Sequence, residues 1–243
     1  MKQTIISIFF CLLIAPVSAQ QTTFEVRGGF SIGGTSPLPM HKEIRRVDGF
    51  NPDVNPSVEL NFTHWIKQRW GVTSGIRCEA KGMTTKAMVK NYSMEIVGSD
   101  GNRMKGNWTG GVQTRVHNIY TTVPMLATYR LSERVNVRGG LYFACLMNGI
   151  FKGKVYEGYL RKDNPTGDKV NFTDESIATY DFSNHLSKFS WGAEIGAGWK
   201  ASRRWNVYSE LTWGFNDIFE KDFDTITFNM YPIYLNIGVG YDL

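Results

Sequence analysis

Apolar and polar residues alternate along eight separate segments of this chain of 243 residues. Alternation with a period of two is the pattern of a β-strand whose two faces meet different surroundings. The eight segments comprise residues 24–32, 58–63, 70–81, 119–129, 135–145, 189–200, 205–215 and 231–243. Beyond the N-terminus, no stretch approaches the run of about 20 apolar residues that a membrane-spanning helix needs. The pattern therefore predicts an all-β fold.

The connections between these segments alternate in length. Three are short, namely 66–69, 131–134 and 201–204. Four are long and polar, namely 34–56, 84–114, 152–187 and 217–229. Short periplasmic turns and long extracellular loops are typical of barrels in bacterial outer membranes. We therefore expect an eight-stranded up-and-down antiparallel transmembrane β-barrel, with both chain ends on the side of the short turns.

The alternation alone does not say which face points inward, because a soluble barrel around an apolar ligand turns its apolar set to the inside. Aromatic residues of the apolar set lie beside the short turns. They are Phe24, Trp70, Tyr129, Trp199, Trp205 and Tyr241. A headgroup interface favours such residues, since the ring enters lipid while its polar tip stays in water. We expect the apolar face to contact the lipid bilayer of the outer membrane. A soluble exported carrier of an apolar ligand remains an alternative.

The polar face of the predicted strands carries charges of both signs. The acids are Glu25, Glu59, Glu79, Glu194 and Glu210, and the bases are Arg27, Arg77, Lys81 and Arg138. Side chains fill the interior of an eight-stranded barrel, and charges buried there must be paired. The sequence predicts a lumen filled by ion pairs, without an open pore.

The first residues have the pattern of an export signal. Lys2 precedes an apolar run from Ile5 to Ala15, and small residues up to Ala19 suit a signal peptidase. We predict a signal peptide over residues 1–19 and a barrel domain over 20–243. The net charge of +5 is too small to indicate a nucleic-acid partner. Cys78 and Cys145 fall on the third and fifth predicted strands, so we expect them to stay unpaired.

Residues for catalysis are scarce in this sequence. His64 and His117 are isolated and fall in the outward phase, while His41 and His185 lie in long segments. We find no metal-ligand spacing, phosphate-binding glycine loop or activated cysteine. We therefore predict no catalytic, metal or cofactor-binding residues and no cofactor. A hydrolase with its site at a barrel rim is an alternative, which requires a histidine and a serine or carboxylate to meet in the fold.

A filled lumen leaves the rims of the barrel free for recognition. Segments 84–114 and 152–187 are long for structureless loops and are therefore candidates for contact with a protein partner. In the first of them, a turn-rich tip at Gly98–Asn102 favours flanks that extend the barrel strands as a hairpin. We expect a non-enzymatic barrel whose surface segments bind a partner or assist envelope transport or protein secretion.

The fourth and fifth predicted strands carry short motifs of a known family. They read Tyr120-Thr121-Thr122-Val123-Pro124-Met125-Leu126, then Tyr129-Arg130 and Gly139-Gly140-Leu141-Tyr142. Lys81-Gly82 and the closing Gly238-Val239-Gly240-Tyr241 fit the same family. Over the mature chain the sequence resembles the PorT-like outer membrane β-barrel family of Bacteroidetes. The resemblance implies a transmembrane barrel and, from the family's named member, a role in protein secretion across the outer membrane.

Overall fold

Eight antiparallel strands close into a ring in the computed structural model, which describes residues 22–98, 101–172 and 178–243. In ring order they are β1 (Thr22–Pro37), β3 (Asn55–Trp65), β4 (Trp70–Val97), β5 (Arg103–Arg130), β6 (Val135–Lys162), β9 (Phe189–Lys200), β10 (Trp205–Gly214) and β11 (Met230–Asp242). The ring closes because β1 pairs with both β3 and β11. The predicted eight-stranded barrel is confirmed. The predicted signal peptide, 1–19, lies outside the described residues.

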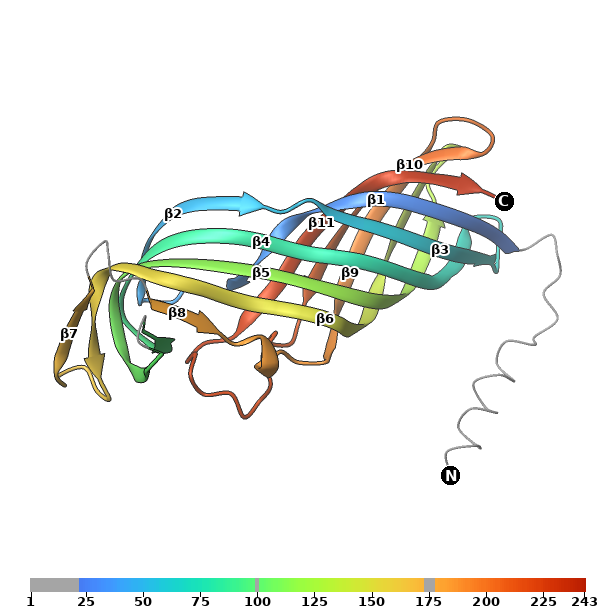
Figure 1. Cartoon of the computed structure of the whole chain (residues 1–243). Coiled ribbons are helices and arrows are strands. Elements are labelled where there is room, and N and C mark those ends of the chain that lie inside the picture. Colours follow the sequence, from blue (N-terminus) through green and yellow to red (C-terminus); the bar gives the residue numbers. More distant parts are fainter. Residues whose placement is uncertain (1–21, 99–100, 173–177) are drawn as a thin grey trace, which may run out of the picture.

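Further elements continue the barrel at one end only. They are β2 (Ile44–Pro52), β7 (Lys169–Phe172), β8 (Ala178–Asp181) and the short 3₁₀ helix η1 (Ser183–His185). Figure 1 shows β2, β7 and β8 at one end of the molecule, while the C-terminus and the start of β1 lie at the other. We call this extension the head: the end of β1, β2 with the loops on either side of it, β7, β8, η1, the distal parts of β4, β5 and β6, and the loop before β11. The described residues contain no helix that is both long and apolar enough to cross a membrane.

The apolar face of the ring points outward. Phe30, Ile76 and Ile195 are 58%, 59% and 65% exposed, whereas their polar neighbours face the lumen. At the short-turn end, Trp70 packs on Tyr129 and Trp205 packs on Tyr241, with ring centroids 4.7 and 5.1 Å apart. The predicted orientation is confirmed. A soluble carrier with an apolar lumen is wrong for this chain, because its lumen is polar.

The prediction of a loop over 84–114 is wrong in most of its length. Strands β4 and β5 have 28 residues each and pair as a hairpin whose described flanks reach Val97 and Arg103. The physical reason is that the apolar residues change to the opposite face of the strands. In the part of β4 before Gly82 the apolar residues point outward, whereas Met83, Val89 and Val112 of the head point inward to an apolar core. The predicted extension of the flanks of the Gly98–Asn102 tip as a hairpin is confirmed.

Two of the other three long segments also differ from expectation. In 152–187, β6 continues to Lys162, and β7 and β8 pair with it. In 34–56, β1 continues to Pro37, and β2 pairs with β4 beyond the point where β3 begins. Segment 217–229 is a loop as predicted, and Ile218, Phe219 and Ile226 anchor it in the core of the head. The long segments thus form a folded extension of the barrel.

The two cysteines of the described chain are free, as predicted. Cys78 in β4 and Cys145 in β6 are both register partners of Thr121 in β5. A full strand therefore separates them, and two strand spacings of about 9–10 Å exceed what a disulfide spans.

Candidate functional site

Paired charges fill the lumen of the ring. Arg77 of β4 lies at the centre, donating to Glu194 through both terminal nitrogens and to Glu210 at 3.2 Å. The carboxylates of Glu59 and Glu79 lie 3.9 and 3.6 Å from the same guanidinium. All five side chains are almost completely buried. The predicted network is confirmed, and it places four carboxylates around one cation.

A second guanidinium continues this network. Arg27 of β1 contacts Glu25 at 2.7 Å and Glu210 at 2.8 Å. Arg138 of β6 approaches Glu210 at 3.4 Å. Glycines make room for these groups: a Cβ on Gly196 would lie 2.4 Å from the Glu210 side chain, and one on Gly240 would lie 2.0 Å from Glu25. The glycine-rich polar face therefore accommodates the ion pairs.

An aromatic layer separates the charges from the head. The Lys81 ammonium, 3.1 Å from Glu79, lies 5.7, 5.0 and 5.8 Å from the ring centroids of the three tyrosines that form this layer. They are Tyr120, Tyr142 and Tyr234. Cations bind to the faces of such rings, with about 2 kcal/mol when water is excluded. This layer separates the polar lumen from the apolar core of the head.

The filled lumen predicts the electrical behaviour of the protein. Reconstituted into planar bilayers, the full chain is expected to show no stable conductance, because paired charges and the tyrosine layer occupy the path of an ion. The measurement is single-channel recording over a range of voltages. Steady conductance at the level of a general porin would contradict the closed lumen.

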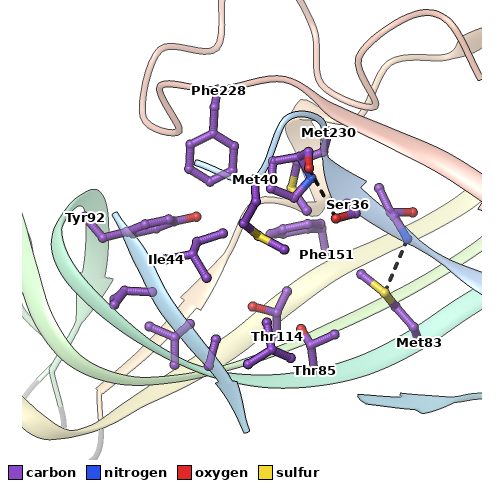
Figure 2. A pocket seen from close by; sticks show the side chains of 16 residues that line it. Ser36, Met40, Ile44, Met83, Thr85, Tyr92, Thr114, Phe151, Phe228 and Met230 are labelled. Atoms are coloured by element: carbon purple, nitrogen blue, oxygen red, sulfur yellow. Dashed lines mark hydrogen bonds between the residues drawn. The ribbon is translucent and has the colours of Figure 1, made fainter. Parts of the chain in front are cut away.

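Above the tyrosine layer, the head forms an apolar cavity of about 100 Å³ that is partly open to solvent (Figure 2). Five parts of the chain contribute to its wall. They are the end of β1, β2 with the loop before it, the distal β4–β5 hairpin, Phe151 of β6, and the loop before β11 with the first residue of β11. Labelled side chains from these parts include Met40, Ile44, Met83, Tyr92 and Phe228. The residues that meet here are separated by up to about two hundred positions in the sequence.

The wall of the cavity combines flexible apolar groups with a few hydroxyls. Three methionines, Met40, Met83 and Met230, line it, and methionine adapts its shape to different contents. Met40 is 55% exposed and lies on the solvent side. Tyr92 packs edge-on against Phe228, and burial of its hydroxyl raises the pKa of Tyr92 well above its usual value. The cavity thus presents a neutral surface.

Hydroxyl groups give the cavity limited polar character. The hydroxyls of Thr114 and Tyr180 form a hydrogen bond with each other at 2.6 Å, so the Thr114 hydroxyl already has a partner. The backbone N–H of Thr35 donates to the sulfur of Met83 at 3.3 Å. Thr85 also lines the cavity, and the rest of the wall is mostly carbon and sulfur.

The histidines occupy positions that the sequence only partly predicts. His64 contacts the hydroxyl of Thr22 at 3.0 Å, and His117 lies 3.8 Å from a carboxylate oxygen of Asp53. His117 is isolated in the sequence, and the fold brings Asp53 beside it from 64 positions away. His41 contacts Glu43 at 2.7 Å, and His185 stacks on Phe223. In the described part of the chain, no histidine has both a carboxylate and a hydroxyl as contacts. A histidine meets a carboxylate at His41–Glu43 and at His117–Asp53, which is the meeting that the rim-site hydrolase requires, so that alternative stays open.

A comparison with protein families identifies the family of this chain. The profile described as "Outer membrane protein beta-barrel domain" matches residues 18–220. The chain belongs to this family. The protein therefore resides in the outer membrane, its short turns face the periplasm and its head is extracellular. The PorT-like branch is a finer assignment than this match provides.

Solved structures of other proteins are similar to this chain at low sequence identity. Ail, the attachment invasion locus protein of Yersinia pestis, is 12% identical, with 92% of this chain and 98% of that chain covered and a TM-score of 0.33. Neisserial surface protein A is 8% identical, with 90% and 96% covered and a TM-score of 0.38. The outer membrane protease OmpT from Escherichia coli is 12% identical, with 93% and 98% covered and a TM-score of 0.33. No curated protein matches this chain.

The cavity is the feature that sequence reasoning missed. The wall residues of the β4–β5 hairpin alternate in the sequence, as Met83, Thr85, Ala87 and Val89 show. This alternation was the available signal. In the head, however, the apolar residues of the strand point inward, whereas in the membrane-spanning part they point outward. In the described chain, no group of three or more His, Cys, Asp or Glu side chains is arranged to hold a metal ion.

Proposed function

We propose that this outer membrane barrel is a non-enzymatic binding protein without an open pore, whose extracellular head holds a small apolar group. The observation that carries the proposal is the cavity, on which five separate parts of the chain converge. Partners reach the head from outside the cell, because paired charges and tyrosines fill the lumen below it. Cavities lined by apolar side chains with few polar groups are typical of ligand sites.

The size and lining of the cavity define the class of ligand. An apolar cavity of about 150 Å³ accepts a benzene molecule. The cavity here, at about 100 Å³, suits a branched aliphatic chain end or a similarly small group. Thr85 offers a hydroxyl and Met40, which is 55% exposed, lies on the solvent side of the wall, so a group with one polar end fits best. Such a group belongs to a small molecule or to the surface of a binding partner.

Filling the cavity tests this proposal. Ala87 lines it, whereas Lys86, the preceding residue of β4, is exposed on the other face of the strand. We expect Ala87→Trp to weaken binding of branched-chain alcohols at least tenfold, because the indole occupies the space that the ligand needs. The measurement is ligand-detected NMR titration of the full chain in detergent micelles.

Lys86→Trp provides the matched control, since it adds the same side chain one position away. It is expected to leave alcohol binding unchanged. Both variants are expected to retain the electrophoretic shift on heating that a folded barrel shows. Absence of saturable binding to the wild-type chain, or equal weakening in both variants, would refute an apolar binding site in the cavity.

The finer assignment to the PorT-like branch, with a role in envelope transport or protein secretion, is part of the same proposal. The motifs Tyr120–Leu126 and Gly139–Tyr142 support it. In this proposal the head binds an apolar group of an exported protein or of another envelope component. Quantitative proteomics of the culture medium tests it: deletion of the gene is expected to deplete a set of secreted proteins. An unchanged set of secreted proteins would contradict the secretion role and leave ligand binding to be judged separately.

A further inference from the structure

Three polar atoms converge over Gly82 of β4, at the level where the barrel passes into the head. A Cβ added to Gly82 would lie 2.9 Å from Nδ1 of His117, 3.0 Å from Oδ1 of Asn55 and 3.0 Å from Oδ2 of Asp53. The three side chains come from β5, the start of β3 and the link between β2 and β3. Because glycine has no side chain, the three atoms share one small space.

None of these three atoms has a hydrogen-bond partner within the described chain, although each is buried. The orientation of the Asn55 amide is fixed, since its Nδ2 donates to the backbone oxygens of Ser31 at 3.1 Å and Gly82 at 3.0 Å. Oδ1 of Asn55 must therefore face the shared space, and the whole residue is 0% exposed. Buried acceptors without a donor are costly. A carboxylate oxygen and an amide oxygen that share one space need a cation or a donor between them.

We propose that His117, Asp53 and Asn55 form a binding site for a divalent first-row transition-metal ion such as Zn²⁺. Imidazole nitrogen together with carboxylate and carbonyl oxygen suits such ions, whereas Ca²⁺ and Mg²⁺ prefer oxygen alone. Two donors of one tetrahedral Zn²⁺ lie about 3.4 Å apart. The 3.8 Å between Nδ1 of His117 and Oδ2 of Asp53 needs only a small movement to reach this separation.

The position of the site gives the ion a structural task. Asp53 follows directly after β2, and β2 contributes Ile44 and Val47 to the wall of the apolar cavity. An ion shared by Asp53, Asn55 and His117 ties the end of β2 to the start of β3 and to β5. The backbone N–H of Asp53 already donates to the oxygen of Gly82 at 3.3 Å, which positions the carboxylate. The metal ion thus reinforces the attachment of β2 to the sheet.

The experiment uses the full chain without a histidine tag, freed of metal by chelation and kept in detergent micelles. Zn²⁺ binding is measured by calorimetry, and Co²⁺ binding is measured by the visible absorption that imidazole ligation alters. We expect one equivalent of each ion to bind. His117→Gln and Asp53→Asn are expected to weaken binding at least tenfold. Gly82→Ala is expected to weaken it similarly, because the added methyl group occupies the shared space.

His41→Gln is the matched control, because His41 also pairs with a carboxylate in the head, that of Glu43 at 2.7 Å. It is expected to leave both metal titrations unchanged. The electrophoretic shift of each variant on heating verifies that its barrel is folded. The Co²⁺ spectrum of the wild-type chain tests the site without any substitution. Absence of Zn²⁺ and Co²⁺ binding at millimolar concentration, or equal binding by His117→Gln, would overturn the proposal.

Discussion

Replacing Arg77 by methionine is expected to lower the free energy of unfolding of the barrel by about 3–5 kcal/mol, the cost of removing one partner from a buried ion pair. Arg77 lies within 4 Å of four carboxylates, and the closest contacts are to Glu194 and Glu210. Without the guanidinium these acids face one another in a space closed to water. Urea unfolding of the reconstituted protein, followed by tryptophan fluorescence, measures the loss.

An exposed ion pair provides the control. Arg103 contacts Glu95 at 3.2 Å with its side chain 78% exposed, and exposed pairs contribute only about 0–1 kcal/mol. Arg103→Met is therefore expected to leave the unfolding curve almost unchanged. Adding Glu194→Gln to Arg77→Met should restore part of the lost stability, because one unpaired charge is removed. Equal effects of Arg77→Met and Arg103→Met would show that the lumen network is not the main support of the barrel.

Removing most of the head is expected to leave the barrel inserted and to abolish ligand binding. The register defines where to cut. Met83 pairs with Val116, so residues 84–115 can be replaced by an Asn-Gly turn. Phe182 donates its backbone N–H to the oxygen of Phe151 at 2.8 Å, so a two-residue turn can replace 152–181. All the charged residues of the lumen network lie in the part that remains.

Heat-dependent electrophoresis of the outer membrane fraction measures the outcome for the shortened chain. We expect the transition temperature to stay within a few degrees of that of the full chain, because the ion pairs and the apolar band are retained. Alcohol binding should be lost, because Tyr92 and most of the β4–β5 wall of the cavity are removed. A shortened chain that fails to insert would show that the head contributes to folding of the barrel.

The membrane-spanning part was predictable because lipid and lumen impose opposite demands on alternate residues. On β10, Trp205, Val207 and Leu211 are exposed to lipid, while Glu210 between them is buried. A period-two pattern therefore marks the strand and its orientation together. The short turns were predictable for a related reason, since Ile66–Arg69 interrupts the pattern between two clear strands and leaves little chain for anything but a turn.

The head was not predictable in the same way. Its strands meet water outside and an apolar core inside, so the alternation on β4 continues with reversed polarity after Gly82. Exposed Lys86 and Lys90 then give the segment the composition of a loop. Both the cavity and the proposed metal site depend on residues far apart in the chain, such as Asp53 and His117, and no local motif connects them.

The location of the functional surface is the central claim, and complementation of a deletion strain tests it most directly. The fitness of the deletion strain is measured over a panel of growth conditions. It is then measured in strains that carry one of two variants, each present in the outer membrane at the abundance of the wild-type protein. One variant is the shortened chain without most of its head. The other replaces the basic residues of the periplasmic turns by serine. They are Lys67, Arg69, Arg134, Arg203 and Arg204.

The account predicts that the turn variant restores fitness and that the shortened chain does not, because the cavity and its wall lie in the extracellular head. Full complementation by the shortened chain, together with failure of the turn variant, would place the functional surface at the periplasmic rim and contradict the account.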